Sequence, residues 1–234
     1  DGTDQGTVSS TSLIVSNAAP VLSGLVIEPA GPRVEDTLTC TYTDLSDADG
    51  DNPTISYEWS LAGSAIGTSS TLDSGFVKTD ELTCRATPTD GIVAGTTLTA
   101  TTTILNTPPE IDSGSVDIQP TNPTSSDSLT ISLSASDADA DSITHTVDWY
   151  VDGVFTDSST VLVMDLPDLG VGGGSQVYAI ITPNDGDEDG ASVQTATLDV
   201  GNSAPVISNL AVIATTDADQ DGDSSTAWIT DTLE

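Results

Sequence analysis

The sequence predicts an all-β fold built from tandem β-sandwich modules, and two observations support this prediction. The segment Asn17-Ala-Ala-Pro20 recurs as Asn106-Thr-Pro-Pro109 and again as Asn202-Ser-Ala-Pro205, which indicates repeated modules. Within the repeats, apolar residues alternate with hydroxyl residues, as in Leu38-Thr-Cys-Thr-Tyr42 and Leu129-Thr-Ile-Ser-Leu133. This period of two is typical of half-buried strands, and we find no convincing helix.

The repeat divides the chain into four parts. Residues 1–17 are expected to form the final strand of a preceding module, and 204–234 the start of a following one. Two complete modules of about seven strands each are expected over 18–107 and 108–203. Matched features of these modules are Asp47-Ala-Asp-Gly-Asp51 with Asp137-Ala-Asp-Ala-Asp141, Trp59 with Trp149, Gly63 with Gly153, and Thr87-Pro-Thr-Asp-Gly91 with Thr182-Pro-Asn-Asp-Gly186.

The composition is extremely acidic. There are 37 acidic residues against 3 basic ones, which gives a formal net charge of −34. Such a chain repels nucleic acid and anionic lipid, because both are bound through Lys and Arg. Metal cations and salt are the expected companions, and no apolar run is long enough to insert in a membrane.

The two cysteines fit the strand order of the first module. Cys40 falls in its second expected strand, Trp59 in the third and Cys84 in the sixth, which is the immunoglobulin pattern of an inter-sheet bridge beside a buried indole. The second module has Ile131 and Ala179 at the cysteine positions, so both positions are expected to face the core. We therefore predict a Cys40–Cys84 disulfide and an oxidising compartment.

The acidic loops and the strands after them resemble a known group of repeats. Ser46-Asp-Ala-Asp-Gly-Asp51 is followed by Tyr57-Glu-Trp59, and Ser136-Asp-Ala-Asp-Ala-Asp141 by Asp148-Trp149. These residues resemble the bacterial PKD-like (polycystic-kidney-disease-type) and cadherin-like immunoglobulin-fold repeats. The resemblance implies tandem immunoglobulin-like β-sandwich domains arranged as an elongated rod, in large secreted or surface-anchored proteins such as adhesins, stalks and accessory regions of exoenzymes.

Carboxylates at alternate positions form the candidate metal sites. Calcium takes six to eight oxygen ligands, and alternate aspartates in a tight loop can supply several of them. In an immunoglobulin-like sandwich the two acidic loops of a module lie at the end where the chain enters, beside Asn17 or Asn106, so calcium there would lock neighbouring modules. The alternative is that these loops are solvated acidic turns. The candidate ligands at the joints are Asp47, Asp49, Asp51, Asp90, Asp137, Asp139, Asp141, Asp185 and Asp187. Asp217, Asp219 and Asp221 precede an expected second strand and are expected to form a separate site or an insertion.

No arrangement of residues indicates catalysis. The single histidine, His145, lies in an expected strand, and no nucleophile motif accompanies it. We expect a non-enzymatic segment of an extracellular or cell-surface fibre, stalk or adhesin. Its partners would be neighbouring repeats of the same polypeptide and, in a filament, other copies.

Two other interpretations remain open. The chain would alternatively be a ligand- or polysaccharide-binding accessory region of a secreted hydrolase, which an exposed row of aromatic side chains would favour. A third interpretation is that the charge reflects a saline habitat, in which case sodium chloride would replace calcium.

Overall fold

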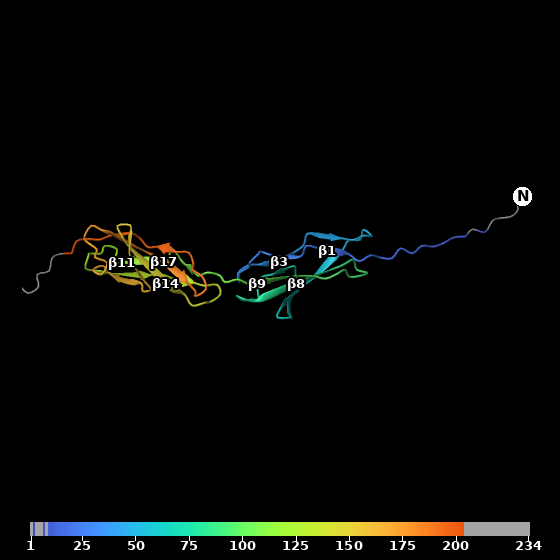
Figure 1. Ribbon diagram of the computed structural model, residues 1–234, viewed down its shortest axis with the longest axis horizontal. Coiled ribbons are helices and arrows are strands. Elements are labelled where there is room, and N and C mark those ends of the chain that lie inside the picture. Colours follow the sequence, from blue (N-terminus) through green and yellow to red (C-terminus); the bar gives the residue numbers. More distant parts are fainter. Residues whose placement is uncertain (1, 3–6, 8, 204–234) are drawn as a thin grey trace, which may run out of the picture.

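The computed structural model describes residues 2, 7 and 9–203, which form two all-β sandwiches lying end to end (Figure 1). The first sandwich, here called module 1, holds β1–β9, and the second, module 2, holds β10–β19. No helix occurs among the described residues, and therefore none that could cross a membrane. The predicted fold class, tandem immunoglobulin-like sandwiches in an elongated arrangement, is confirmed.

Module 1 consists of two antiparallel layers. One layer has the order β2-β3-β7 and continues into the pair β1-β4, while the facing layer has the order β6-β5-β8-β9. The strands are β1 (Val21–Ser23), β2 (Val26–Glu28), β3 (Leu38–Thr41), β4 (Asp44–Ser46), β5 (Thr54–Leu61), β6 (Ser64–Gly67), β7 (Thr71–Leu72), β8 (Glu81–Thr89) and β9 (Leu98–Thr103).

Module 2 repeats this topology. Its layers are β11-β12-β16 with the pair β10-β13, and β15-β14-β17 with β18 and β19 both pairing with β17. The strands are β10 (Glu110–Ile111), β11 (Asp117–Gln119), β12 (Ser128–Ser132), β13 (Ala135–Ser136), β14 (Thr144–Val151), β15 (Val154–Ser159), β16 (Val163–Asp165), β17 (Gln176–Asn184), β18 (Val193–Gln194) and β19 (Leu198–Asp199).

Each sandwich has its own core around the predicted tryptophan. Trp59 and Trp149 are both fully buried, on β5 and β14. In module 1, Cys40 and Cys84 form the predicted disulfide, and Cys84 pairs with Trp59 across β5 and β8. Closing the 44-residue separation between the cysteines stabilises module 1 by about 4 kcal/mol in the chain-entropy model. Ile131 and Ala179 fill the matched positions in module 2.

Glycine positions define two recurring features of the modules. Ala62-Gly63 and Asp152-Gly153 have positive φ at both residues, so β5–β6 and β14–β15 are joined by tight two-residue hairpins. Gly95 and Gly190 lie where the chain approaches β9 and β18, and a Cβ on either would collide with the carbonyl oxygen of Pro20 or Pro109. The segments that lead into β9 and β18 therefore pack directly against the segment by which the chain enters each module.

The partial modules predicted at the two ends of the chain are not tested by the structure. Residues 9–20 form no strand, so the assignment of 1–17 to a preceding module stays a prediction. The predicted following module over 204–234, with Asp217, Asp219 and Asp221, lies outside the described residues.

Candidate functional site: acidic loops at the module joints

The acidic loops of each module lie at the end where the chain enters, as predicted. In module 1 these are residues 47–51, between β4 and β5, and 90–94, between β8 and β9. In module 2 they are residues 137–141, between β13 and β14, and 185–189, between β17 and β18. Because each loop directly follows or precedes a strand of the sandwich, the sheets fix its position.

Both central loops fold through the first aspartate of their triplet. Asp47 Oδ1 accepts a hydrogen bond from Asp49 N at 2.8 Å, and Asp137 Oδ1 accepts from Asp139 N at 2.9 Å. The turn then requires positive φ at Gly50 and Ala140. The alternating triplets are therefore true turns, in which one aspartate oxygen is used by the backbone and the other is left available.

We call the segment where the chain enters a module its joint, residues 17–18 for module 1 and 106–107 for module 2. Each joint holds the two acidic loops of its module by the same pair of hydrogen bonds. Ala18 N donates to Asp49 Oδ2 at 2.5 Å, and at the next joint Thr107 N donates to Asp139 Oδ2 at 2.6 Å. The asparagine before each of these residues donates its side-chain amide to the other acidic loop: Asn17 to Asp90 Oδ2 and Asn106 to Asp185 Oδ2, both at 2.8 Å. The recurring asparagine is thus a structural residue that ties the entering chain to its module.

These bonds alter the titration of the two aspartates. The Asn106 amide, together with the N–H groups of Glu188 and Asp187, lowers the pKa of Asp185 to about 2. The Asn17 amide, followed by the N–H groups of Val93 and Ile92, lowers the pKa of Asp90. Both carboxylates therefore act as hydrogen-bond acceptors for the joint. They were predicted as metal ligands, but their oxygens already have partners.

The three aspartates of each central loop bring their carboxylate oxygens close enough together to bind one cation. In each of the sets Asp47, Asp49, Asp51 and Asp137, Asp139, Asp141, one oxygen from every carboxylate lies within 4.8 Å of the others. Among the described residues, the buried side-chain oxygens without a hydrogen-bond partner include Asp47 Oδ2, Asp137 Oδ2, Asp139 Oδ1 and Thr107 Oγ1. Buried oxygens of this kind suit a hard cation, which would replace the hydration that they have lost.

An open hollow beside the second triplet lies between the two modules. Its volume is about 190 Å³, and carboxylates from both sides border it. Glu35 comes from module 1, whereas Glu110 and Asp137 come from module 2. The remaining lining residues are Thr107, Pro108, Ser136 and Ala138. The joint therefore offers space for water or a hydrated cation in an acidic environment.

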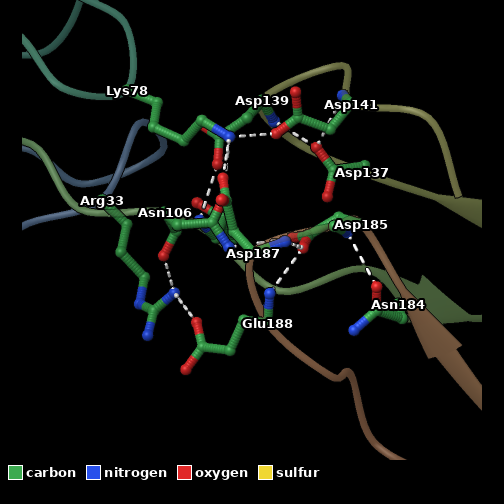
Figure 2. Close-up of polar contacts among 12 residues, drawn as sticks. Arg33, Lys78, Asn106, Asp137, Asp139, Asp141, Asn184, Asp185, Asp187 and Glu188 are labelled. Carbon is green, nitrogen blue, oxygen red and sulfur yellow. Dashed lines mark hydrogen bonds and ion pairs between the residues drawn. The ribbon is translucent and has the colours of Figure 1, made fainter.

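Two basic side chains of module 1 complete the joint with module 2 (Figure 2). Lys78 Nζ donates to Asp187 Oδ2 at 2.8 Å, to Asn106 Oδ1 at 3.1 Å, and also to Asp141. Arg33 Nη1 lies 3.6 Å from Glu188 Oε2 and also donates to the backbone oxygen of Asn106. The bonds to Asp141 and Asp187 raise the pKa of Lys78 well above its usual value. Lys78 therefore stays protonated between the two acidic loops.

The acidic loops lie where the sequence predicted them, but their protein partners were not predicted. Asp187 was predicted as a metal ligand, yet the structure pairs it with Lys78. Arg33, Lys78 and Glu188 were not identified. A signal was present, because two of the three basic residues in the chain, Arg33 and Lys78, lie at this one joint.

Comparisons with known proteins give similar folds at low identity. No family model matches the chain, and no curated protein matches it. A two-domain fibronectin type III segment of chicken tenascin is 13% identical, covering 76% of this chain and 99% of that one, with a TM-score of 0.42. Three N-terminal domains of the outer capsid protein Hoc of bacteriophage RB49 are 14% identical, covering 80% and 71%, with a TM-score of 0.35.

A third similar structure consists of fibronectin type III-like modules of Clostridium thermocellum CbhA. It is 16% identical, covering 76% of this chain and 95% of that one, with a TM-score of 0.29. Similarity at these levels carries no functional argument. The assignment of this chain to the class of tandem immunoglobulin-like sandwiches rests on its own strand pairing and core.

Proposed function

We propose that this chain is a non-enzymatic structural segment of a bacterial extracellular fibre, stalk or adhesin, whose PKD-like or cadherin-like modules are stiffened by calcium at their joints. The observation that carries the proposal is the repeated joint. At both Asn17 and Asn106, an amide and a backbone N–H hold two acidic loops, and each triplet keeps a buried oxygen without a partner.

The charge of the loops supports a cation at each triplet. Three carboxylates whose oxygens lie within 4.8 Å of one another repel strongly unless a positive charge is present. In module 2, Lys78 contacts Asp141 but does not bond to Asp137 Oδ2 or Asp139 Oδ1. Calcium would be held by Asp47, Asp49 and Asp51 in module 1, and by Asp137, Asp139 and Asp141 in module 2, with water completing the shell.

The disulfide and the short joints support an extracellular mechanical role. The Cys40–Cys84 disulfide is typical of proteins that fold in an oxidising compartment. Between the last strand of module 1, which ends at Thr103, and the first strand of module 2, which begins at Glu110, lie only residues 104–109. So short a connection, fixed by side-chain bonds on both sides, suits a chain that transmits force or sets a distance.

Calcium binding is tested by thermal unfolding and small-angle X-ray scattering of residues 1–234 in calcium, in EDTA, and in EDTA with high sodium chloride. We expect calcium to raise the melting temperature and to increase the maximum dimension. D47N/D49N and D137N/D139N should each lose part of the calcium effect, whereas D157N, on the exposed edge strand β15, should retain all of it. Equal recovery in sodium chloride would contradict calcium-stiffened joints and favour the saline-habitat interpretation.

One observation favours the alternative of a polysaccharide-binding accessory region. On module 2, Tyr150 stacks on Tyr178 with 5.0 Å between ring centroids, and Phe155, which is 54% exposed, meets Tyr150 edge-on. Such side chains combine a broad apolar ring with, in tyrosine, a hydroxyl that can form a hydrogen bond, and this combination suits the apolar faces and hydroxyl groups of a sugar. The chain's negative charge would restrict such a ligand to a neutral glycan.

Affinity electrophoresis in gels containing a neutral soluble glucan tests this alternative. Retardation of the chain that is lost in Y178A and F155A, but kept in T83A, would favour glycan binding. Thr83 is the matched control because it occupies the position of Tyr178 in module 1, next to Cys84 as Tyr178 is next to Ala179. Unchanged mobility of the parent chain would leave the structural role as the better account.

A further inference from the structure

The end of module 1 that faces module 2 presents two cations, and the loop that it meets presents two acids. Lys78 contacts Asp187, and Arg33 lies near Glu188, as Figure 2 shows. The side chain of Lys78 is only 21% exposed, so its charge depends on these partners more than a free surface lysine would. The question is whether every module of this type presents the same charges.

Matched hydrogen bonds identify the corresponding positions on the far end of module 2. Arg33 N donates to Asp36 Oδ2 at 2.7 Å, and Thr124 N donates to Asp127 Oδ2 at 2.7 Å, so Thr124 occupies the position of Arg33. Thr79 N donates to Ile104 O, and Gly174 N to Val200 O. Gly173 therefore occupies the position of Lys78. The far end of module 2 is uncharged at both positions.

Matched hydrogen bonds also identify the loop of module 1 that corresponds to the acidic loop of module 2. Asp185 Oδ1 accepts from the N–H groups of Asp187 and Glu188, as Asp90 Oδ1 accepts from those of Ile92 and Val93. Module 1 thus carries two apolar residues where module 2 carries two acids. Ile92 is 75% exposed and Val93 is 39% exposed.

We propose that these two positions form a pairing code that selects which module follows which. A module end with cations at the positions of Arg33 and Lys78 accepts a loop with acids at the positions of Asp187 and Glu188. An uncharged end, such as Thr124 and Gly173, accepts an uncharged loop, such as Ile92 and Val93. The exposed Ile92–Val93 loop is accordingly a docking surface for an immunoglobulin-like module with an uncharged end.

Mismatched pairs cost free energy in both directions, and this gives the code its selectivity. Cations placed on an apolar loop lose their partners while remaining partly buried, and an acidic loop without cations leaves Asp141 and Asp187 unneutralised. Exposed ion pairs contribute little by themselves. Selectivity therefore comes mainly from rejection of the wrong neighbour. The code needs the joint shown here but does not need the calcium proposed above.

Comparison of the parent, two double variants and the quadruple variant that combines them tests the code in the full chain. R33M/K78M makes the end of module 1 uncharged, and D187I/E188V gives module 2 the loop residues of module 1. Every protein compared, the parent and the charge-swapped pair included, carries D141N, because Lys78 also bonds to Asp141. Spin labels at T99C and T146C, on exposed positions of β9 and β14, report the distance distribution between modules. All measurements are made in EDTA, so that loss of a calcium ligand has no effect on the result.

We expect a broader distribution in each double variant and a narrower one in the quadruple variant, which restores an uncharged pair. The matched control I92D/V93E makes the same exchange in reverse on module 1, away from this joint, and should leave the distribution unchanged. A quadruple variant as broad as the broader double variant, or double variants as narrow as the parent, would overturn the code.

The charge-swapped pair K78D/D187K provides a second test, because it exchanges the two groups across the joint. K78D alone should broaden the distribution, and K78D/D187K should narrow it again. The code is excluded if K78D/D187K is as broad as K78D and the broadening in the quadruple variant is the sum of that in the two double variants. Neither result depends on calcium binding.

Discussion

At the scale of single residues, the asparagine that recurs at each joint also determines how one aspartate of its module titrates. Its side-chain amide donates to one acidic loop, and the next backbone N–H donates to the other. A carboxylate that accepts several N–H bonds is stabilised in its charged form. Asp185 illustrates this, because its three donors come from Asn106, Asp187 and Glu188.

Acid titration provides a prediction for Asp185. Its folded-state pKa of about 2 lies below the usual 3.8, so its stabilising contribution is complete above pH 3.8 and is lost as the pH falls toward 2. We expect its carboxyl ¹³C resonance to titrate near pH 2. D185N should reduce the loss of unfolding free energy between about pH 4 and 2 compared with the parent. A midpoint near 4 would show that the Asn106 bond does not form in solution.

The residues of the joint also show the limit of sequence reasoning. The triplets and Asn106 could be identified because they recur, and recurrence places them at equivalent ends of equivalent modules. Lys78 and Arg33 do not recur, since Gly173 and Thr124 replace them. A pattern that depends on repetition cannot reveal a contact that belongs to one joint.

At the scale of strands and loops, hydrophobic alternation predicted the sheets but not where the strands break. About seven strands were expected in each module, whereas module 1 has nine, partly because the strand that enters it divides into β1 and β2 around Gly24. A Cβ at Gly24 would collide with the side chain of Thr43, so the break depends on how closely that side chain approaches the backbone at Gly24. Such a distance is a property of the packed sheet and is absent from the periodicity of either strand.

The close contact between Gly190, which precedes β18, and Pro109 gives a prediction at this scale. G190A places a methyl group against the Pro109 carbonyl, and we expect the free energy of unfolding of module 2 to fall by about 1–3 kcal/mol. Chemical denaturation followed by tryptophan fluorescence measures the loss. G172A is the control, because no atom lies within 4 Å of its added Cβ, and its effect should stay within about 0.5 kcal/mol.

At the scale of the whole molecule, the two cores are separate. The buried cluster around Trp59 contains residues of module 1 alone, and the cluster around Trp149 contains residues of module 2 alone. Each sandwich should therefore unfold as its own cooperative unit. The joint couples the units through polar contacts, which are weaker than a shared core.

Differential scanning calorimetry should accordingly show two transitions, and reduction should move one of them. Loss of the Cys40–Cys84 disulfide removes about 4 kcal/mol from module 1, which corresponds to a fall of roughly 20 °C in its melting temperature. Module 2 has Ile131 and Ala179 at those positions and should keep its transition. The variant C40A/C84A should reproduce the effect of reduction. Equal shifts in both transitions would mean that the modules unfold together.

The net charge of −34 makes monovalent salt act in opposite directions on the modules and on the joint. Salt relieves self-repulsion across the molecule, so each sandwich should become more stable. At the joint, the contacts of Lys78 and Arg33 are attractive and partly exposed, so the same salt should weaken them as the Debye length falls from about 10 Å at 0.1 M to about 3 Å at 1 M. In EDTA, sodium chloride should therefore raise both melting temperatures while broadening the spin-label distance distribution between T99C and T146C. If stability and order at the joint instead rise together with salt, the joint is held by general neutralisation of the acidic loops and not by these two cations.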